Sequence, residues 1–220
     1  MIFVNFKSNV KSTGENALSI VKALKEAQKK TKVPIILAPH DFDLHAIREI
    51  WGGEIWVQHA DYDRGTGKNQ VELIKEYPQK IDGVFLNHSE HRFEGWSLLS
   101  RVVNECVEYG LKVLVFVGSL DDIEKLLAAE AHPTFIAYEP PELVGSNETS
   151  VAKSKASVIE DAFEITKKAK IPLIVGAGVK DKADVQKSVE LGAVGVAVSS
   201  AIIAAEDPGK KVLELASGFK

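Results

Sequence analysis

Short apolar runs alternate with amphipathic stretches along the whole of this 220-residue chain. The runs are rich in Val, Ile and Phe, which is typical of strands that are buried on both faces. They cover residues 2–6, 33–38, 54–58, 83–87, 112–117, 133–138, 171–175 and 195–199. Between them, stretches such as 17–27 and 158–165 follow the 3.6-residue period of an amphipathic helix. The alternation therefore predicts repeated βα units around a parallel sheet.

The spacing of the runs indicates how this sheet closes. One strand with its helix takes roughly 25–30 residues, the size of one βα unit. Eight such units fill the chain without a linker, a low-complexity segment or a shift in composition. We therefore predict a single α/β domain over residues 1–220, a closed (β/α)8 barrel rather than an open sheet. Chemistry in such barrels takes place at the carboxyl ends of the strands.

Composition excludes several classes of protein. Hydrophobic residues make up 45% of the chain and charged residues 26%, as in an average globular domain. A net charge of −4 gives no support to a nucleic-acid partner. No apolar run approaches the length of a membrane span, and the chain begins with a strand pattern instead of a signal peptide. Cys106 is the only cysteine and lies at helical spacing. We expect a cytoplasmic protein without an internal disulfide, in which Cys106 is a small core residue.

Three predicted strands end in polar side chains of complementary chemistry. Lys7 follows the first strand, His88 the fourth and Glu139 the sixth. These three groups can meet only if the strands run parallel in one sheet or barrel. Taken one at a time, each has an ordinary alternative: a salt-bridge partner or cap for the glutamate, a surface charge for the lysine, and a hydrogen-bonded core residue for the histidine.

The segment after Glu139 has the composition of a lid. Two prolines follow the glutamate directly, which favours a stiff, non-helical start. The sequence Gly-Ser-Asn at 145–147 then offers a hinge of small residues. We expect the stretch from Pro140 to Asn147 to close over Glu139, because a base at a strand end followed by a hinged loop is what a lidded active site needs.

Five segments in this order resemble the signature segments of the triosephosphate isomerase family. They are residues 4–7, 86–92, 137–145, 176–179 and 195–200. The likeness spans nearly the whole chain and is greatest to the short archaeal members. It implies a (β/α)8 TIM barrel that interconverts dihydroxyacetone phosphate and glyceraldehyde 3-phosphate by proton transfer, without a metal or other cofactor.

The resemblance also implies roles for individual residues. Triosephosphate isomerases use a glutamate base, a neutral histidine electrophile and a closing loop. His88 precedes a predicted helical start, and the N–H groups of a helix N-terminus would disfavour a charged ring. The residues carried over are Glu139, His88 and Lys7 for catalysis, and Asn5, Phe6, Lys7, Val144, Gly145, Gly178, Ser199 and Ser200 for binding the phosphorylated triose.

A polar loop from Asp61 to Asn69 follows the third strand. It is longer than the common βα connection of about two to six residues, and on composition alone it could be a surface loop. The resemblance implies instead that it inserts into a neighbouring subunit, with Thr66 near that subunit's copies of Asn5 and His88. We therefore expect a homo-oligomer, either a dimer or a tetramer.

Other interpretations of the same residues stay open at this point. His88 and His91 could suggest a metal site, although their spacing is not that of a zinc protease. The stretch 59–63 could bind calcium, although a plain polar loop also accounts for it. A barrel enzyme of tryptophan biosynthesis would share a phosphate site but not the lysine, histidine and glutamate set. A non-catalytic metabolite sensor would be favoured by the loss of one of these groups, and none is lost.

Overall fold

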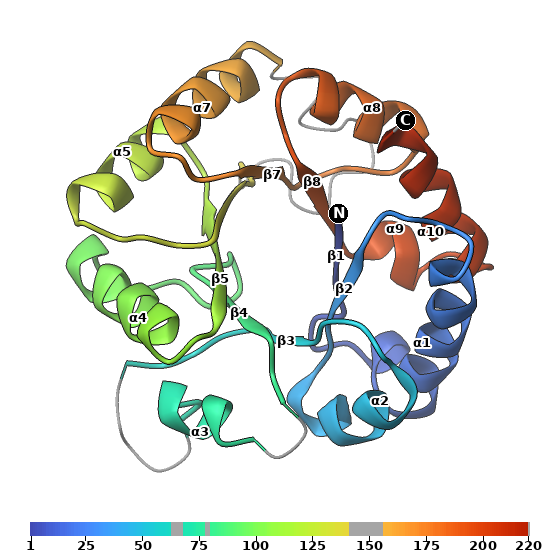
Figure 1. The fold of residues 1–220 in the computed structure, drawn as a ribbon. Helices are drawn as coiled ribbons and strands as arrows, with labels where there is room; N and C mark the ends of the chain where they lie inside the picture. Colours follow the sequence, from blue (N-terminus) through green and yellow to red (C-terminus); the bar gives the residue numbers. More distant parts are fainter. Residues whose placement is uncertain (63–67, 78–79, 141–155, 220) are drawn as a thin grey trace.

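The computed structural model describes residues 1–62, 68–77, 80–140 and 156–219. Eight parallel strands form a single sheet at the centre, and the helices surround it as an outer ring (Figure 1). The strands are β1 Ile2–Asn5, β2 Ile35–Ala38, β3 Trp56–Val57, β4 Gly83–Leu86, β5 Lys112–Val117, β6 Phe135–Tyr138, β7 Leu173–Val175 and β8 Gly195–Val198. Each lies within a run that the sequence predicted, although β3 is only two residues long.

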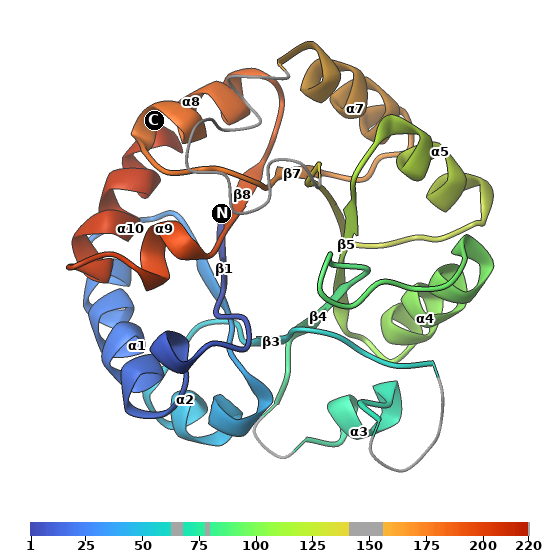
Figure 2. The same cartoon turned by 180° about the vertical axis from the view of Figure 1, so that it is seen from behind.

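The order of the strands confirms the closed barrel. Neighbours in the sheet follow the order β2-β1-β8-β7-β6-β5-β4-β3. The remaining gap between β2 and the start of β3 is bridged, because Leu37 pairs with Ile55 and its N–H donates to the carbonyl of Glu54 at 3.2 Å. Figures 1 and 2 show the resulting ring from its two ends.

Three of the described α-helices, α5 Leu120–Ala128, α8 Lys182–Glu190 and α10 Pro208–Ala216, begin at side-chain caps. Ser119, Asp181 and Asp207 each accept a hydrogen bond from a backbone N–H in the first turn of the helix that follows. The helices are α1 Gly14–Gln28, α2 Leu44–Ile50, α3 Val71–Lys75, α4 Trp96–Glu108, α5 Leu120–Ala128, α7 Ala156–Lys168, α8 Lys182–Glu190, α9 Ser200–Ile203 and α10 Pro208–Ala216, with 3-10 turns at Val10–Ser12, Asp41–Asp43 and Ser217–Phe219. None of the helices in the described ranges is long and apolar enough to cross a membrane.

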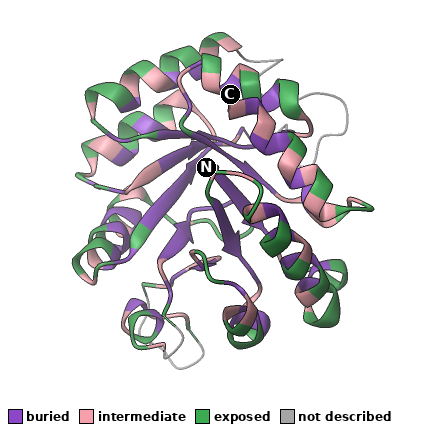
Figure 3. Ribbon diagram, turned by 45° about the vertical axis from the view of Figure 1, so that its right-hand side comes forward, coloured by how far each residue is buried: buried purple, intermediate pink, exposed green. Residues whose placement is uncertain are grey.

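Two hydrophobic layers hold the barrel together. The larger lies between strands and helices and includes Cys106, which is fully buried as predicted. The smaller fills the barrel interior, where the rings of Phe3 and Trp56 meet edge to face at 5.1 Å. Gly83 makes room for this packing, since a Cβ there would lie 2.5 Å from the Trp56 ring. The strands are buried except at Lys112 and Phe135, the first residues of β5 and β6, while exposed residues appear on the outer helix faces (Figure 3).

Candidate active site

A cavity of about 300 Å³ opens at the carboxyl ends of the strands. It brings together side chains that are far apart in sequence, as expected for a parallel barrel. Among the residues lining it are Asn5, Phe6, Lys7, His88, Glu139, Gly178, Ser199 and Ser200. These are all the predicted site residues that the structure describes. Val144, Gly145 and the rest of the expected lid after Pro140 lie outside the described residues.

Strand alternation explains how two of these residues come to line the cavity. Phe3 in β1 and Ala137 in β6 belong to the interior layer of the barrel. Residues two positions further along a strand lie on the same face, which places Asn5 and Glu139 above that layer. Phe6 has the opposite parity, and its buried side chain belongs to the layer between strands and helices.

Lys7 is held in an unusual backbone conformation. Its φ of 55° lies in the left-handed region, and its N–H donates to Oδ1 of Asn5 at 2.9 Å. Its ammonium group lies 3.1 Å from a carboxylate oxygen of Glu90. A non-glycine residue at positive φ carries conformational strain, and such strain clusters at functional sites. The hydrogen bond with Asn5 therefore holds the backbone of Lys7 in this conformation, and the ion pair with Glu90 holds its ammonium group in place.

His88 lies between two carboxylates. Its Nε2 is 3.2 Å from Glu139 and its Nδ1 is 3.3 Å from Glu90. Burial lowers the pKa of His88, but the hydrogen bonds to Glu139 and Glu90 outweigh burial and raise the pKa to about 9. The prediction of a helix N-terminus beside His88 is wrong, because α4 begins only at Trp96. The backbone N–H of Glu90 nevertheless donates to Nδ1 of His88 at 3.3 Å, which favours a ring with an unprotonated Nδ1. The two carboxylates favour the charged ring and this N–H the neutral one, so the neutral electrophile stays a prediction.

Glu90 lies in the segment 86–92 that resembles the family, and no role is assigned to it from the sequence. Its carboxylate joins Lys7 to His88, with one oxygen toward each. The hydrogen bond to His88 is the main reason why the pKa of Glu90 falls to about 2, and Lys7 lowers it further. The only signal in the sequence was a carboxylate two residues after a strand-end histidine.

Asn87 and Phe116 make contacts that hold the position of His88. Asn87 donates to the carbonyl of Phe116 at 2.9 Å and accepts the N–H of Phe93 at 3.1 Å. The Phe116 ring meets the His88 ring edge to face, with centroids 4.8 Å apart. These contacts join the end of β4 to β5, and Phe116 itself lines the cavity beside His88. Sequence reasoning missed both residues, since neither has a reactive side chain.

The far wall of the cavity comes from the segments after β7 and β8. Ala177 and Gly178 have φ of 64° and 71°, so two consecutive residues adopt the left-handed conformation. Ser199 and Ser200 follow β8 where α9 begins. Both segments line the same cavity as Lys7. Backbone N–H groups in such turns are suited to binding anions.

Glu139 is packed tightly against the start of the segment after β7. Its N–H donates to the carbonyl of Val117 at 2.8 Å, and its side chain is 11% exposed. A Cβ added to Gly176 would lie 2.9 Å from Oε1 of Glu139 and 3.3 Å from its Cβ. The absence of a side chain at Gly176 therefore defines the space in which the glutamate lies.

This packing gives a first prediction. Gly176→Ala is expected to displace the Glu139 carboxylate and lower kcat by roughly tenfold or more, because Glu139 is the predicted base and small misplacements of such a group are costly. Gly176 does not have a positive φ, so crowding is the main effect of the substitution. Steady-state kinetics would measure it against Gly52→Ala, a glycine with nothing within 4 Å of the added Cβ. Equal kcat for the two variants would contradict the proposed crowding.

Fold and cavity together define a (β/α)8-barrel enzyme with a lysine, a histidine and a glutamate in one polar site. The family model for triosephosphate isomerase matches residues 1–217. The chain belongs to the triosephosphate isomerase family, whose members are isomerases.

Similar proteins cover the chain almost completely. The triosephosphate isomerase of Thermoplasma volcanium is 35% identical over 217 residues, which is 97% of this chain and 98% of the relative. That of Methanothermus fervidus is 36% identical over 220 residues, covering 98% and 96%. That of Methanopyrus kandleri is 35% identical over 227 residues, covering 100% and 97%. The resemblance seen in the sequence is thereby confirmed.

Proposed function

We propose that this protein is a triosephosphate isomerase that interconverts dihydroxyacetone phosphate and D-glyceraldehyde 3-phosphate. The observation that carries the proposal is the convergence of Lys7, His88 and Glu139 on one cavity with the turns after β7 and β8. A proton transfer beside a carbonyl needs a base, a hydrogen-bond donor for the oxygen and a cation for the developing negative charge. The three side chains supply one of each.

Glu139 acts as the base in this proposal. Its carboxylate takes a proton from C1 of dihydroxyacetone phosphate, the C1–H electron pair forms a C1–C2 double bond, and the carbonyl oxygen becomes an enediolate oxygen. Protons move between the two oxygens, and Glu139 returns a proton to C2 to give the aldehyde. No oxidant or cofactor is required, because the electrons stay within the substrate.

His88 serves the two substrate oxygens. The present separation of 3.2 Å between its Nε2 and Glu139 leaves no room for a substrate atom. Glu139 must therefore turn toward the substrate carbon, and a substrate oxygen takes its place as the partner of Nε2. Loss of the carboxylate contact removes the largest influence that raises the pKa of His88. We propose that the ring becomes neutral at this stage and donates its remaining proton as a hydrogen bond.

The phosphate is expected to bind on the far wall of the cavity. Gly178, Ser199 and Ser200 offer backbone N–H groups there, and Lys7 adds a positive charge. Val144 and Gly145 would complete this site if the stretch after Pro140 closes as a lid. Closure would also exclude water from the enediolate.

An assay with glyceraldehyde 3-phosphate tests the proposal most directly. Formation of dihydroxyacetone phosphate is followed through a coupled reductase that oxidises NADH. We expect turnover that disappears in Glu139→Gln. A folded protein that binds the phosphorylated triose without turning it over would support the metabolite sensor instead, and one that neither binds nor converts it would contradict both.

The two carboxylates beside His88 predict a pH dependence of stability. The pKa of His88 in the folded protein is about 9, above its ordinary value of 6.5. Its ion pairs therefore stabilise the fold fully below about pH 6.5, and this contribution is lost as the pH rises through 9. We expect the free energy of unfolding to fall by on the order of 2 kcal/mol across this interval relative to His88→Gln.

Two measurements check this prediction. Denaturant unfolding of wild type and His88→Gln at both ends of the interval gives the stability difference, and the variant serves as the control for all other groups. NMR titration of the His88 ring gives the pKa itself. A measured pKa of His88 near 6.5, the ordinary value, would show that the carboxylates do not stabilise the protonated ring.

We also propose that the protein is a homo-oligomer through the loop from Asp61 to Asn69. Large apolar side chains that support this lie in the segments after β1, β2 and β3: Val10 is 84% exposed, Phe42 90% and Tyr62 41%. All three segments follow neighbouring strands and so lie at the same end of the barrel, where they offer apolar side chains to a neighbouring subunit. Thr66, which the family resemblance places near the partner's active site, lies outside the described residues.

Shortening the loop between positions 63 and 68 is expected to yield monomers with reduced kcat. The reason is that the loop would no longer reach and support the active site of the neighbouring subunit. Sedimentation velocity together with kinetics measures both effects. Phe42→Ser, which keeps the loop but removes an exposed apolar ring, is expected to weaken assembly as well. A fully active wild-type monomer at nanomolar concentration would overturn the proposal.

A further inference from the structure

Two histidines and an aspartate form a cluster outside the cavity described above. His59 and Asp61 follow β3, and His91 belongs to the turn after β4. Nε2 of His91 lies 3.0 Å from one oxygen of Asp61, and Nε2 of His59 lies 4.0 Å from the other. One ligand atom from each of the three lies within 4.8 Å of the other two. None of these residues lines the catalytic cavity.

Asn69 indicates how the His59 ring is oriented. Its amide nitrogen donates to a carboxylate oxygen of Asp41 at 2.7 Å and lies 3.1 Å from Nε2 of His59. An amide nitrogen can only donate, so Nε2 of His59 accepts from Asn69 and is unprotonated. Its single lone pair points at Asn69, so a metal ion would take the place of the Asn69 amide as the partner of Nε2. A neutral imidazole nitrogen in this state is the form of histidine that binds metals.

The three groups lie close enough together for a small metal ion. Bonds of about 2.0–2.1 Å in a tetrahedron place ligand atoms roughly 3.3 Å apart. The two histidines lie 3.0 Å and 4.0 Å from different oxygens of Asp61, and one ligand atom from each residue lies within 4.8 Å of the others. Relative shifts of up to about 1.5 Å between ligand atoms would therefore complete the arrangement. Imidazole nitrogens with one carboxylate suit zinc and its neighbours, whereas calcium and magnesium prefer oxygen ligands alone.

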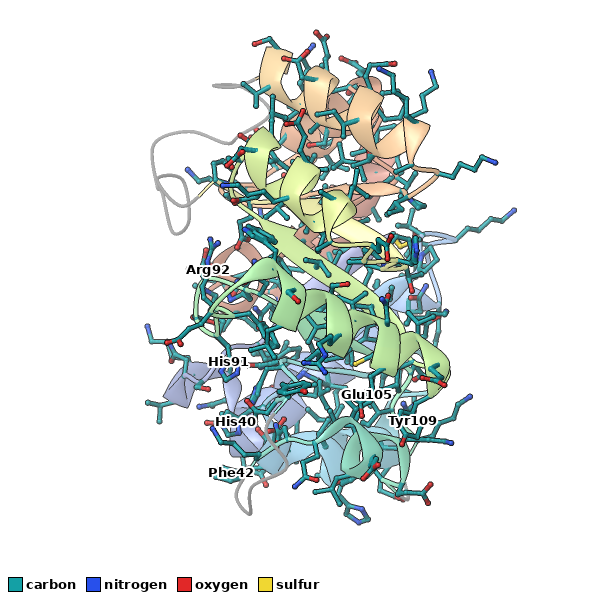
Figure 4. The ribbon with its side chains drawn as sticks, turned by 90° about the vertical axis from the view of Figure 1, so that its left-hand side faces the viewer. His40, Phe42, His91, Arg92, Glu105 and Tyr109 are labelled. Atoms are coloured by element: carbon teal, nitrogen blue, oxygen red, sulfur yellow. The ribbon has the colours of Figure 1, made fainter. Side chains whose placement is uncertain are left out.

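The surroundings favour a cation and leave it access. Asp61 is 12% exposed and its second oxygen accepts the N–H of Asn69 at 2.8 Å, which holds the carboxylate in place. The carboxylate of Asp41 adds a second negative charge beside the cluster. The His91 ring is 42% exposed and lies at the same end of the barrel as His40 and Phe42 (Figure 4). Water can therefore occupy a fourth position on the metal.

We propose that His59, Asp61 and His91 bind one divalent transition-metal ion of the zinc type. The ion would link the base of the loop after β3 to the turn after β4. Asp61 already pairs with Asn69 across that base, where its N–H donates to the Asn69 carbonyl at 2.8 Å. The N–H of His91 in turn donates to the carbonyl of His88. The site is structural, because it fastens two loops without contacting the catalytic cavity.

Cobalt and zinc titrations test the proposal on the full-length protein after dialysis against a chelator. Tetrahedral cobalt with nitrogen and oxygen ligands absorbs visible light strongly, so the spectrum reports the geometry of the site. Zinc that binds at the same site displaces the cobalt and removes this absorption. We expect one ion per chain. Saturating zinc is expected to raise the Tm by roughly 5 °C, since an ion that binds only the folded state stabilises it.

His91→Gln is the decisive variant, since its exposed ring makes a folding defect improbable as a cause of lost binding. We expect a loss of affinity of about a hundredfold or more and no rise in Tm. Asp61→Asn should show the same loss. The matched control is His45→Gln, an exposed histidine on α2, which should bind zinc like wild type. Binding that survives in His91→Gln, or a cobalt spectrum of an octahedral surface ion, would overturn the proposal and leave the cluster as a stacked pair of rings with an ion pair.

Discussion

Lys7→Ala is expected to abolish measurable binding of the phosphorylated triose. The substrate carries two negative charges at neutral pH, and the Lys7 ammonium is held in the cavity by its ion pair with Glu90 at 3.1 Å. This charge acts in both the ground state and the transition state, so its loss affects KM and kcat together. Alanine can keep the backbone of Lys7, because the φ of 55° strains any side chain with a Cβ to a similar degree.

Calorimetric titration with a phosphorylated inhibitor measures this effect. Lys11→Ala is the matched control, because Lys11 lines the same cavity but is exposed at its edge. We expect Lys11→Ala to weaken binding by less than about tenfold, since exposed charges are screened. If Lys7→Ala bound the inhibitor as tightly as wild type, the electrostatic role of Lys7 would be wrong.

Glu139→Asp is expected to lower kcat by on the order of a hundredfold with little change in KM. The substitution draws the carboxylate back by about one methylene, and a misplacement of that size has a cost of this order. The rest of the site stays in place, since the backbone N–H of Glu139 is held by Val117 and not by the side chain.

Steady-state kinetics and exchange of the C1 proton with solvent measure the loss. The matched control is Glu94→Asp, an exposed carboxylate in the turn before α4, which should behave like wild type. Unchanged proton exchange in Glu139→Asp would remove this residue from the role of base. A similar loss of kcat in Glu139→Asp and Glu94→Asp would indicate damage to the fold instead.

Local pattern was enough to predict the architecture. Runs of β-branched residues that alternate with helical patterns favour a covered parallel sheet, and eight of them without a linker favour a closed barrel over an open sheet. The boundaries were less predictable. Only Trp56 and Val57 of the third run pair as a strand, because the edge that closes the barrel toward β2 is reduced to the bridge between Leu37 and Ile55.

The main groups of the site could also be predicted, since residues at the ends of parallel strands must converge. The environment of His88 could not be predicted from the sequence. Its charge state depends on Glu90 turning back toward it, and a turn of this kind replaces the helix that the sequence indicated before α4. The grouping of His59 with His91 was equally hidden, because two loops after different strands come together only once the barrel has formed.

Three positions around the cavity have a left-handed backbone although they are not glycine: Lys7, Asn87 and Ala177, with φ of 55°, 59° and 64°. Each follows a strand. The conformation costs roughly 1 kcal/mol or more at Lys7 and Ala177, and less at Asn87, because asparagine adopts it more readily. The surrounding barrel imposes this strain, so part of its folding free energy is stored in the rim of its own active site. Maximal stability and a well-formed site are therefore competing demands on this chain. Glycine at such a position would relax the backbone, yet it would loosen the segments whose rigidity shapes the cavity.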